Sequence, residues 1–225
     1  MPKREAVSTP LRRLLGLDID LTAFYEFAAS DEQLAPLASR FRGFKPPRYP
    51  TLFDALLNAI ASQQVTLNLA IQLLNRLAQN YGVATSDLHA LPQPEALAHQ
   101  DPEALRKLGF SGQKARTIIE LAQAHIEGRL SSDELTALDD AEAMRRLCQF
   151  RGIGSWTAEY ILLRGLGRLH IYPGNDSGAR NSLQRWLGLT LDYAAVHHTF
   201  ARWRPYAGLI YLHLLLKGLA EAQPL

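Results

Sequence analysis

Two features in the second half of this 225-residue chain have residue types suited to anion binding and acid–base chemistry. The first is Gly152-Ile153-Gly154, which lies between two segments of helical periodicity. A glycine turn there lets the first backbone N–H groups of the next helix approach an anion closely. The second is Asp176, which ends a loop broken by Pro173 and Gly174 and opens another helical pattern. Together they predict a phosphate-binding turn followed by a carboxylate.

Both features also have a simpler structural interpretation. The glycine turn can merely join two packed helices, and Asp176 can merely cap the helix that begins at Ser177. The surroundings of the turn favour a binding role, because two hydroxyl residues follow it and arginines flank it. The residues predicted to hold the phosphate are Gly152, Gly154, Ser155 and Thr157.

Composition and cysteine content narrow the class of protein. The chain is 47% hydrophobic, and no apolar run reaches the roughly 18 residues that a membrane span needs. The basic N-terminus is not followed by the apolar stretch of a signal peptide. Cys148 is the only cysteine, which excludes an internal disulfide and a cysteine-ligated metal centre within one chain. The histidines lack the His-Glu-x-x-His spacing. We expect a soluble cytoplasmic protein without a metal site.

Basic residues gather beside aromatic ones at several places, although the net charge is only +2. They alternate with aromatic residues from Arg40 to Tyr49, flank the glycine turn, and bracket Trp203. Each cluster alone is most simply solvated surface charge. Several such clusters in one chain favour a groove that follows a phosphate backbone.

Helical periodicity recurs along most of the chain. Thr51 with Asp54 predicts a capped helix start, and Asp101 followed by Pro102 predicts another. Gln63-Gln64 interrupts the apolar face of the helix that begins near residue 51. No long stretch alternates polar and apolar residues, so extensive sheet is not expected. The predicted fold class is all-α, with about ten helices in two lobes.

The two lobes are expected to share the chain discontinuously, because no low-complexity linker divides it. Residues 1–49 form an N-terminal helical segment that packs on the C-terminal lobe. Residues 50–165 form a central lobe that includes the glycine turn. Residues 166–225 carry the Asp176 loop and the C-terminal helices. Within the central lobe, residues 109–116 predict a second helix–turn–helix.

The glycine turn and the aspartate belong to a longer pattern. Phe-Arg-Gly-Ile-Gly-Ser-Trp-Thr-Ala-Glu-Tyr at 150–160, followed by Pro-Gly-Asn-Asp, resembles the helix–hairpin–helix DNA glycosylase superfamily. Within it, the chain resembles the 3-methyladenine DNA glycosylase II (AlkA-type) branch. The resemblance runs from about Pro50 to Leu219 and includes Ala-Ser-Gln-Gln-Val at 61–65 and Trp-Arg-Pro-Tyr at 203–206.

Two departures from the family pattern stand out. The bacterial prototype has an extra N-terminal α/β domain, for which the residues before Pro50 leave no room. Ala207 stands where arginine often follows the Trp-x-Pro-x motif, so a wall of the base pocket or a packing contact beside it differs.

The resemblance implies a DNA glycosylase with a DNA cleft between two helical lobes. Asp176 matches the catalytic aspartate, whose carboxylate stabilises the positive charge that develops on the sugar as the N-glycosidic bond breaks. Relatives that also cut the strand have a lysine where this chain has Trp156, and an indole cannot form their Schiff base. Trp156 therefore predicts a monofunctional enzyme and a ring that stacks on a cationic alkylated purine, unless it is ordinary helix packing.

The resemblance also implies a base pocket and a wedge. Trp203, Tyr206 and Tyr211 are candidates for the pocket, although each alone is more often a core residue. Gln64 matches the wedge that fills the gap left by an everted nucleotide, and its alternative role is that of a turn residue.

The expected partner is double-stranded DNA that contains 3-methyladenine or 7-methylguanine, bound by a monomer without an obligate protein partner. No cofactor is expected, apart from the monovalent cation that backbone carbonyls of the hairpin hold in some relatives. Two alternatives stay open. One is an oxidised-base or mismatch glycosylase, and the other is a non-catalytic module that uses the hairpin to grip DNA.

Overall fold

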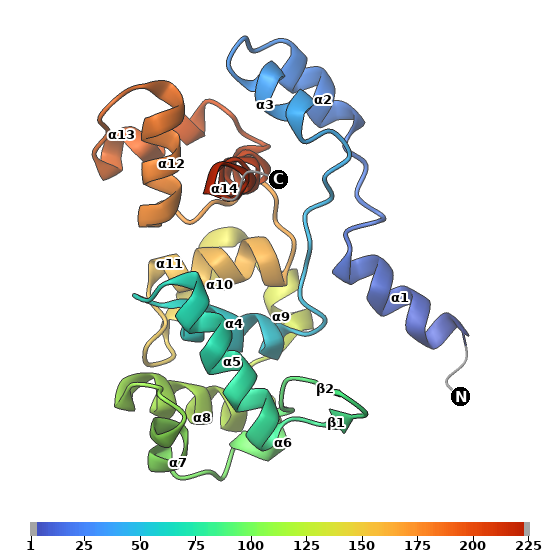
Figure 1. Cartoon of the computed structure of the whole chain (residues 1–225), viewed down its shortest axis with the longest axis vertical. Coiled ribbons are helices and arrows are strands. Elements are labelled where there is room, and N and C mark those ends of the chain that lie inside the picture. The colour runs from blue at the N-terminus through green and yellow to red at the C-terminus, as the bar shows by residue number, and fades with distance from the viewer. Residues whose placement is uncertain (1–3, 223–225) are drawn as a thin grey trace. The chain divides into compact units, whose positions relative to one another are not determined.

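The computed structural model describes residues 4–222, and the chain divides into two compact units. Unit 1 contains the described residues of Met1–Pro50 and Gly167–Leu225, and unit 2 is Thr51–Leu166. The chain therefore begins unit 1, builds all of unit 2, and then returns to complete unit 1 (Figure 1). Residues 1–3 and 223–225, the ends of the predicted terminal segments, lie outside the described residues.

Nearly all regular structure in residues 4–222 is helical, which confirms the predicted all-α class. The helices of unit 1 are α1 (Arg4–Leu14), α2 (Thr22–Ala29), α3 (Leu34–Arg40), α12 (Ser177–Leu187), α13 (Tyr193–Ala201) and α14 (Ala207–Ala222). The helices of unit 2 are α4 (Leu52–Ser62), α5 (Leu67–Tyr81), α6 (Pro94–Leu97), α7 (Pro102–Lys107), α8 (Gly112–Ile126), α9 (Ser132–Ala137), α10 (Asp140–Cys148), α11 (Ser155–Tyr160) and the π-helix η1 (Ile161–Gly165). Ala84–Thr85 and Leu88–His89 add a two-stranded antiparallel pair, β1 and β2.

Helix α4 is the centre of unit 2, because it packs against α5, α8 and η1. It begins with the predicted capping box, in which Thr51 Oγ1 accepts from the Asp54 N–H at 3.0 Å and the Asp54 carboxylate accepts from Thr51 in return. Burial raises the pKa of Asp54, since the carboxyl lies at the edge of the core. The helix ends at Ser62, where Gln63-Gln64 breaks the apolar face as the sequence predicts.

The later helix starts of unit 2 also follow side-chain caps. Asp101, Ser111 and Asp139 accept hydrogen bonds from backbone N–H groups in the first turns of α7, α8 and α10. The helix after the glycine turn ends at Gly165, and its last five residues form the π-helix η1. Local sequence does not distinguish that wider turn from an α-helical one.

Unit 1 has an aromatic core. His213 of α14 is fully buried among Phe24, Phe41 and Phe44, with ring centroids 5.1, 6.3 and 5.3 Å away. Its Nδ1 lies 2.8 Å from the Leu209 carbonyl oxygen. Burial lowers the pKa of His213, because a charged imidazole is poorly solvated there.

The basic cluster between Arg40 and Arg48 contributes largely to the packing of unit 1. The Arg42 guanidinium lies 4.7 Å from the centre of the Tyr25 ring, and Lys45 Nζ donates to the Ile19 carbonyl. Burial lowers the pKa of Arg48, with nearby Arg13 acting in the same direction. Much of this charge therefore has contacts inside the unit and does not form a free basic stripe.

None of the helices in residues 4–222 combines the length and the apolar character needed to cross a membrane.

Candidate active site

The glycine turn between α10 and α11 is anchored inside unit 2 at its first glycine. Gly152 has a φ of 82°, and a Cβ placed on it would lie 2.2 Å from Thr117 Oγ1. That hydroxyl donates to the Arg151 carbonyl at 3.1 Å. Gly152 is therefore required by the fold, both for its left-handed backbone and for the close approach of α8.

The second glycine of the turn, Gly154, is not required by contacts within the fold. Gly154 is the N-cap of α11 with an extended backbone that any residue can adopt (φ −99°, ψ −178°). A Cβ added to it would have no neighbouring heavy atom within 4 Å. Gly154 and Ser155 are both exposed. The turn thus presents open backbone at the start of a helix, as a phosphate contact requires.

Thr157, the fourth residue predicted to bind phosphate, is buried. Its hydroxyl oxygen accepts from Gln63 Nε2 at 2.9 Å, and the same amide nitrogen donates to the Gly152 carbonyl at 2.9 Å. The Thr157 hydroxyl therefore has a structural role in holding the turn, and its contact with a phosphate stays a prediction. The sequence offered no sign of the Gln63 bridge, which joins residues 89 and 94 positions apart.

Gln64, the predicted wedge, lies exposed in the turn between α4 and α5. Its φ of 54° is left-handed, which is uncommon for a residue other than glycine. An exposed side chain on a sharply defined turn is suited to insertion into a duplex.

Trp156 lies on α11 with Tyr160 one turn later, and the two rings lie 5.4 Å apart with planes 30° from parallel. Both side chains are partly exposed. The Tyr160 hydroxyl donates to Asn58 Oδ1 of α4 at 2.9 Å, which fixes the ring. The sequence prediction missed Tyr160, although its four-residue spacing from Trp156 places both rings on one helix face.

Asp176 is the N-cap of α12 and holds its carboxylate in place through two contacts within unit 1. Oδ1 accepts from the Ala179 N–H at 2.8 Å, and Oδ2 accepts from the Tyr211 hydroxyl at 3.2 Å. Tyr211 is buried on α14, so its hydroxyl serves Asp176, and its predicted place in a base pocket stays a prediction. Asp176 as a whole residue is partly exposed, and its role toward a substrate stays a prediction.

The loop before Asp176 is packed closely against α13. A Cβ on Gly174 would lie 2.1 Å from His197 Cε1, so a larger residue there would have to displace the His197 ring. His197 Nδ1 lies 2.8 Å from the hydroxyl of Tyr172, whose ring stacks on Phe200 with centroids 4.1 Å apart. The Asp176 N–H closes the loop by donating to the Pro173 carbonyl at 3.0 Å.

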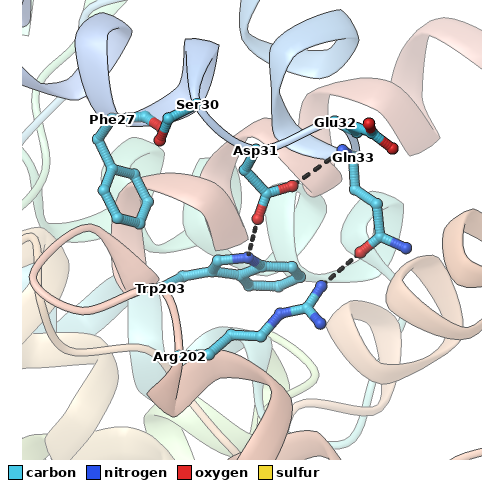
Figure 2. Close-up of a pocket in the computed structure, with 7 residues that line it drawn as sticks. All are labelled: Phe27, Ser30, Asp31, Glu32, Gln33, Arg202 and Trp203. Atoms are coloured by element: carbon cyan, nitrogen blue, oxygen red, sulfur yellow. Dashed lines mark hydrogen bonds between the residues drawn. The ribbon is translucent and has the colours of Figure 1, made fainter.

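Trp203, whose indole N–H points to the Asp31 carboxylate in Figure 2, is almost fully buried in unit 1. Its indole N–H donates to Asp31 Oδ2 at 3.2 Å, and the Arg202 guanidinium lies 4.5 Å from the ring centre. Burial raises the pKa of the Asp31 carboxyl. Hydrogen bonds from the N–H groups of Leu34, Gln33 and Trp203 lower it by more, so the net shift of the pKa is downward. The open hollow of about 600 Å³ beside these residues is bordered by Phe27, Ser30, Asp31, Glu32, Gln33, Arg202 and Trp203.

These contacts give Trp203 a packing role, and its predicted contact with a base stays a prediction. Tyr206 is partly exposed, and its ring lies 5.6 Å from that of Phe24 and 5.2 Å from that of Phe27. Ala207 is fully buried where α14 begins, a position without room for a long charged side chain.

Within residues 4–222, no three histidine, cysteine, aspartate or glutamate side chains converge in a way that would hold a metal ion.

Comparison with known proteins finds solved structures and sequences that are similar to this chain. The solved structure of the 3-methyladenine DNA-glycosylase from Archaeoglobus fulgidus is 31% identical, with a TM-score of 0.83 over 96% of this chain and 76% of that one. The Schizosaccharomyces pombe 3-methyladenine DNA glycosylase, solved in complex with abasic DNA, is 26% identical, with a TM-score of 0.74 over 83% of this chain and 91% of that one.

Among characterised sequences, DNA-3-methyladenine glycosylase 2 of Escherichia coli (strain K12) is 34% identical over 185 residues, which are 80% of this chain and 63% of that protein. The chain spans about three fifths of the length of this and similar curated relatives. The sequence profile of the HhH-GPD superfamily base excision DNA repair proteins matches residues 57–205, which include the glycine turn and Asp176. Because that match covers well over half of the chain, the chain belongs to the HhH-GPD superfamily of base excision DNA repair proteins.

Proposed function

We propose that the chain is a monofunctional DNA glycosylase that hydrolyses the N-glycosidic bond of alkylated purines in double-stranded DNA. The observation that carries this proposal is the Asp176 carboxylate, held by the Ala179 N–H and the Tyr211 hydroxyl in a member of the HhH-GPD superfamily. The relatives named above are 3-methyladenine DNA glycosylases, which supports the substrate class. The abasic DNA bound to the fission yeast relative supports DNA as the partner.

In the proposed reaction, the hairpin backbone at Gly154 and Ser155 holds a phosphate of the damaged strand. Gln64 enters the duplex and occupies the space of the everted nucleotide. As the bond to the purine breaks, positive charge grows on the sugar, and the negative charge of Asp176 stabilises it. The methylated purine departs as a neutral base with the electron pair of the broken bond. Water adds to the anomeric carbon and gives its proton to the Asp176 carboxylate or to solvent, and the product is an intact abasic strand.

The base pocket is proposed to include the Trp156 and Tyr160 rings of unit 2, which lie 5.4 Å apart. Stacked electron-rich faces attract a cationic methylated purine by roughly 1–2 kcal/mol when water is excluded. Such a base is already a good leaving group, so the reaction needs little help from a general acid.

The absence of strand scission is proposed from the residues of the hairpin segment. Phe150 to Asp176 contains no lysine, so that segment supplies no amine for a Schiff base with the sugar. Borohydride added during turnover is therefore expected to trap no covalent protein–DNA adduct. A trapped adduct would show that a lyase step occurs.

The function is tested by a panel of duplexes, each with one defined lesion, scored for abasic-site formation. Methylated purines are expected to be released, whereas 8-oxoguanine and mismatched bases are expected to persist.

Asp176→Asn should lower the single-turnover rate by about 100-fold or more. The same variant should keep its affinity for abasic-site DNA. Release of methylpurine at the parental rate by Asp176→Asn would contradict the catalytic role, and release by neither protein would favour a DNA-binding module.

A further inference from the structure

Lys114 of α8 has an unusual position for a lysine. Its Nζ is half-buried and donates to the Ala61 carbonyl at 2.9 Å and to the Gln63 carbonyl at 2.7 Å. These carbonyls belong to the end of α4, where the helix has no further N–H groups to satisfy them. The amine thus caps the C-terminus of α4 from a neighbouring helix. Burial lowers its pKa, which agrees with an enclosed position.

The residue that follows this cap is the exposed Gln64, with its left-handed φ of 54°. A residue with a Cβ adopts this conformation at a cost of about 1 kcal/mol or more, so its surroundings must stabilise it. The hydrogen bond from Lys114 fixes the Gln63 carbonyl, which belongs to the peptide unit leading into Gln64. Lys114 therefore limits the directions in which the Gln64 side chain can point.

The same turn is joined to the glycine hairpin by the side chain of Gln63. Its amide nitrogen donates both to the Gly152 carbonyl and to Thr157 Oγ1, at 2.9 Å each. On the other side of Gly152, the Thr117 hydroxyl donates to the Arg151 carbonyl at 3.1 Å. Lys114 and Thr117 lie one turn apart on α8, so one helix supports both the Gln64 turn and the hairpin.

We propose that Lys114 and Gln63 are positioning residues that hold the Gln64 tip at a fixed offset from the Gly152–Gly154 turn. The inference rests on the proposed function and extends it. The Gln64 turn and the glycine hairpin cannot move independently. Binding of the DNA backbone by the hairpin and entry of Gln64 into the duplex therefore become one event. A loosened tip would still allow the hairpin to bind DNA, but it would open a stable base pair poorly.

The experiment compares two substrates that differ only in the need for base-pair opening. In one duplex a single 7-methylguanine is paired with cytosine, and in the other the same lesion lies in a bubble of unpaired bases. Lys114→Met keeps the length of the side chain and removes its donors, while Lys114→Arg keeps the charge and the donors. Lys107→Met removes an exposed lysine of the same unit and serves as the matched control.

Lys114→Met is expected to slow single-turnover excision from the paired duplex about tenfold, with much less effect on the bubble. Lys114→Arg should restore most of the rate, and Lys107→Met should match the parent. The double variant with Gln64→Ala should be no slower than Gln64→Ala alone, because the lysine acts through that residue. Equal slowing on both substrates, or additive effects in the double variant, would overturn the proposal.

A binding measurement separates this inference from the proposed function. Fluorescence of 2-aminopurine, placed opposite a tetrahydrofuran abasic analogue, rises when the base unstacks and needs no excision. The rise should be reduced by Lys114→Met and kept by Lys107→Met, and equal rises would refute the positioning role. If the parent protein excises no methylated purine, the proposed function is wrong, but the fluorescence comparison still tests the positioning role of Lys114. If thermal unfolding shows that Lys114→Met does not fold, Gln63→Met is judged by the same two readouts.

Discussion

At the scale of single residues, Asp176 combines a structural and a proposed chemical task. Its two oxygens are engaged differently: Oδ1 completes the cap of α12, and Oδ2 accepts the hydroxyl of Tyr211. Capping fixes the carboxylate in position, while the tyrosine restrains its rotation. A carboxylate that is oriented before the substrate arrives stabilises developing charge without the cost of reorganisation.

Tyr211→Phe tests this restraint by removing one oxygen atom. We expect the single-turnover rate to fall about 3- to 10-fold with unchanged affinity for DNA, because the lost hydrogen bond acts on the reacting carboxylate. Tyr25→Phe is the matched control, since that hydroxyl accepts from the Gly43 N–H at 2.7 Å in the same unit. Equal activities of the two variants would count against a role for Tyr211 at Asp176.

Because His213 is buried, we expect the free energy of unfolding of the protein to depend on pH. Its pKa is lowered by burial, so between that value and the ordinary 6.5 the unfolded chain binds a proton that the folded chain does not. The free energy of unfolding should therefore decrease as the pH falls below 6.5. His213→Leu should reduce the difference between pH 7.5 and 5.5 by about 1 kcal/mol, measured by urea unfolding. His198→Gln, at an exposed position, should leave the difference unchanged.

At the scale of elements, the hairpin uses its two glycines for different reasons. Gly152 meets Thr117 and needs a left-handed backbone, whereas Gly154 is extended and has open space beside it. A pattern of two glycines in the sequence cannot separate these demands, because the contact with α8 links residues far apart in the chain.

Substitution of each glycine by alanine distinguishes the structural demand at Gly152 from the binding role proposed for Gly154. Gly152→Ala should lower the free energy of unfolding by about 1–3 kcal/mol, through backbone strain and the clash with Thr117. Gly154→Ala should change stability by no more than about 0.5 kcal/mol and yet weaken binding to undamaged duplex. Denaturant unfolding and fluorescence anisotropy measure the two effects. Tight binding by a folded Gly154→Ala protein would argue against backbone contact at that residue.

Elements with local signals were predictable from sequence, and elements fixed by distant contacts were not. Thr51 and Asp101 cap the helices that they were predicted to start, because capping involves only the next few residues. The π-helix η1 and the strand pair were missed, since neither has a distinctive local pattern.

The same distinction holds for the candidate site. Gly152, Gly154 and Asp176 could be selected because their residue types and spacing carry a recognisable chemical meaning. The contacts of Gln63 with Thr157 and of Tyr211 with Asp176 span 94 and 35 positions. Such contacts depend on how whole helices pack, so their participants resemble ordinary core or turn residues in the sequence.

At the scale of the whole molecule, binding to DNA should depend strongly on salt. The proposed contacts involve phosphates, so each neutralised phosphate contributes a slope of about −0.9 in log affinity against log salt. Affinity for undamaged duplex should fall about 10- to 100-fold between 50 and 200 mM salt. Two duplexes of unrelated sequence should bind equally. Titration by anisotropy at several salt concentrations checks this, and a flat response would contradict a phosphate-directed interface.

The division of unit 1 into two chain segments has a consequence for biosynthesis. When the ribosome has made helices α2 and α3, the α14 partner that packs on α3 has not yet been translated. Unit 2 is contiguous, so it can fold while it emerges, but the aromatic side chains of the first segment must wait roughly 9–34 s for the rest of their core. During that interval, Phe24 and Phe41 are exposed to chaperones and proteases, and the nascent chain is most vulnerable there.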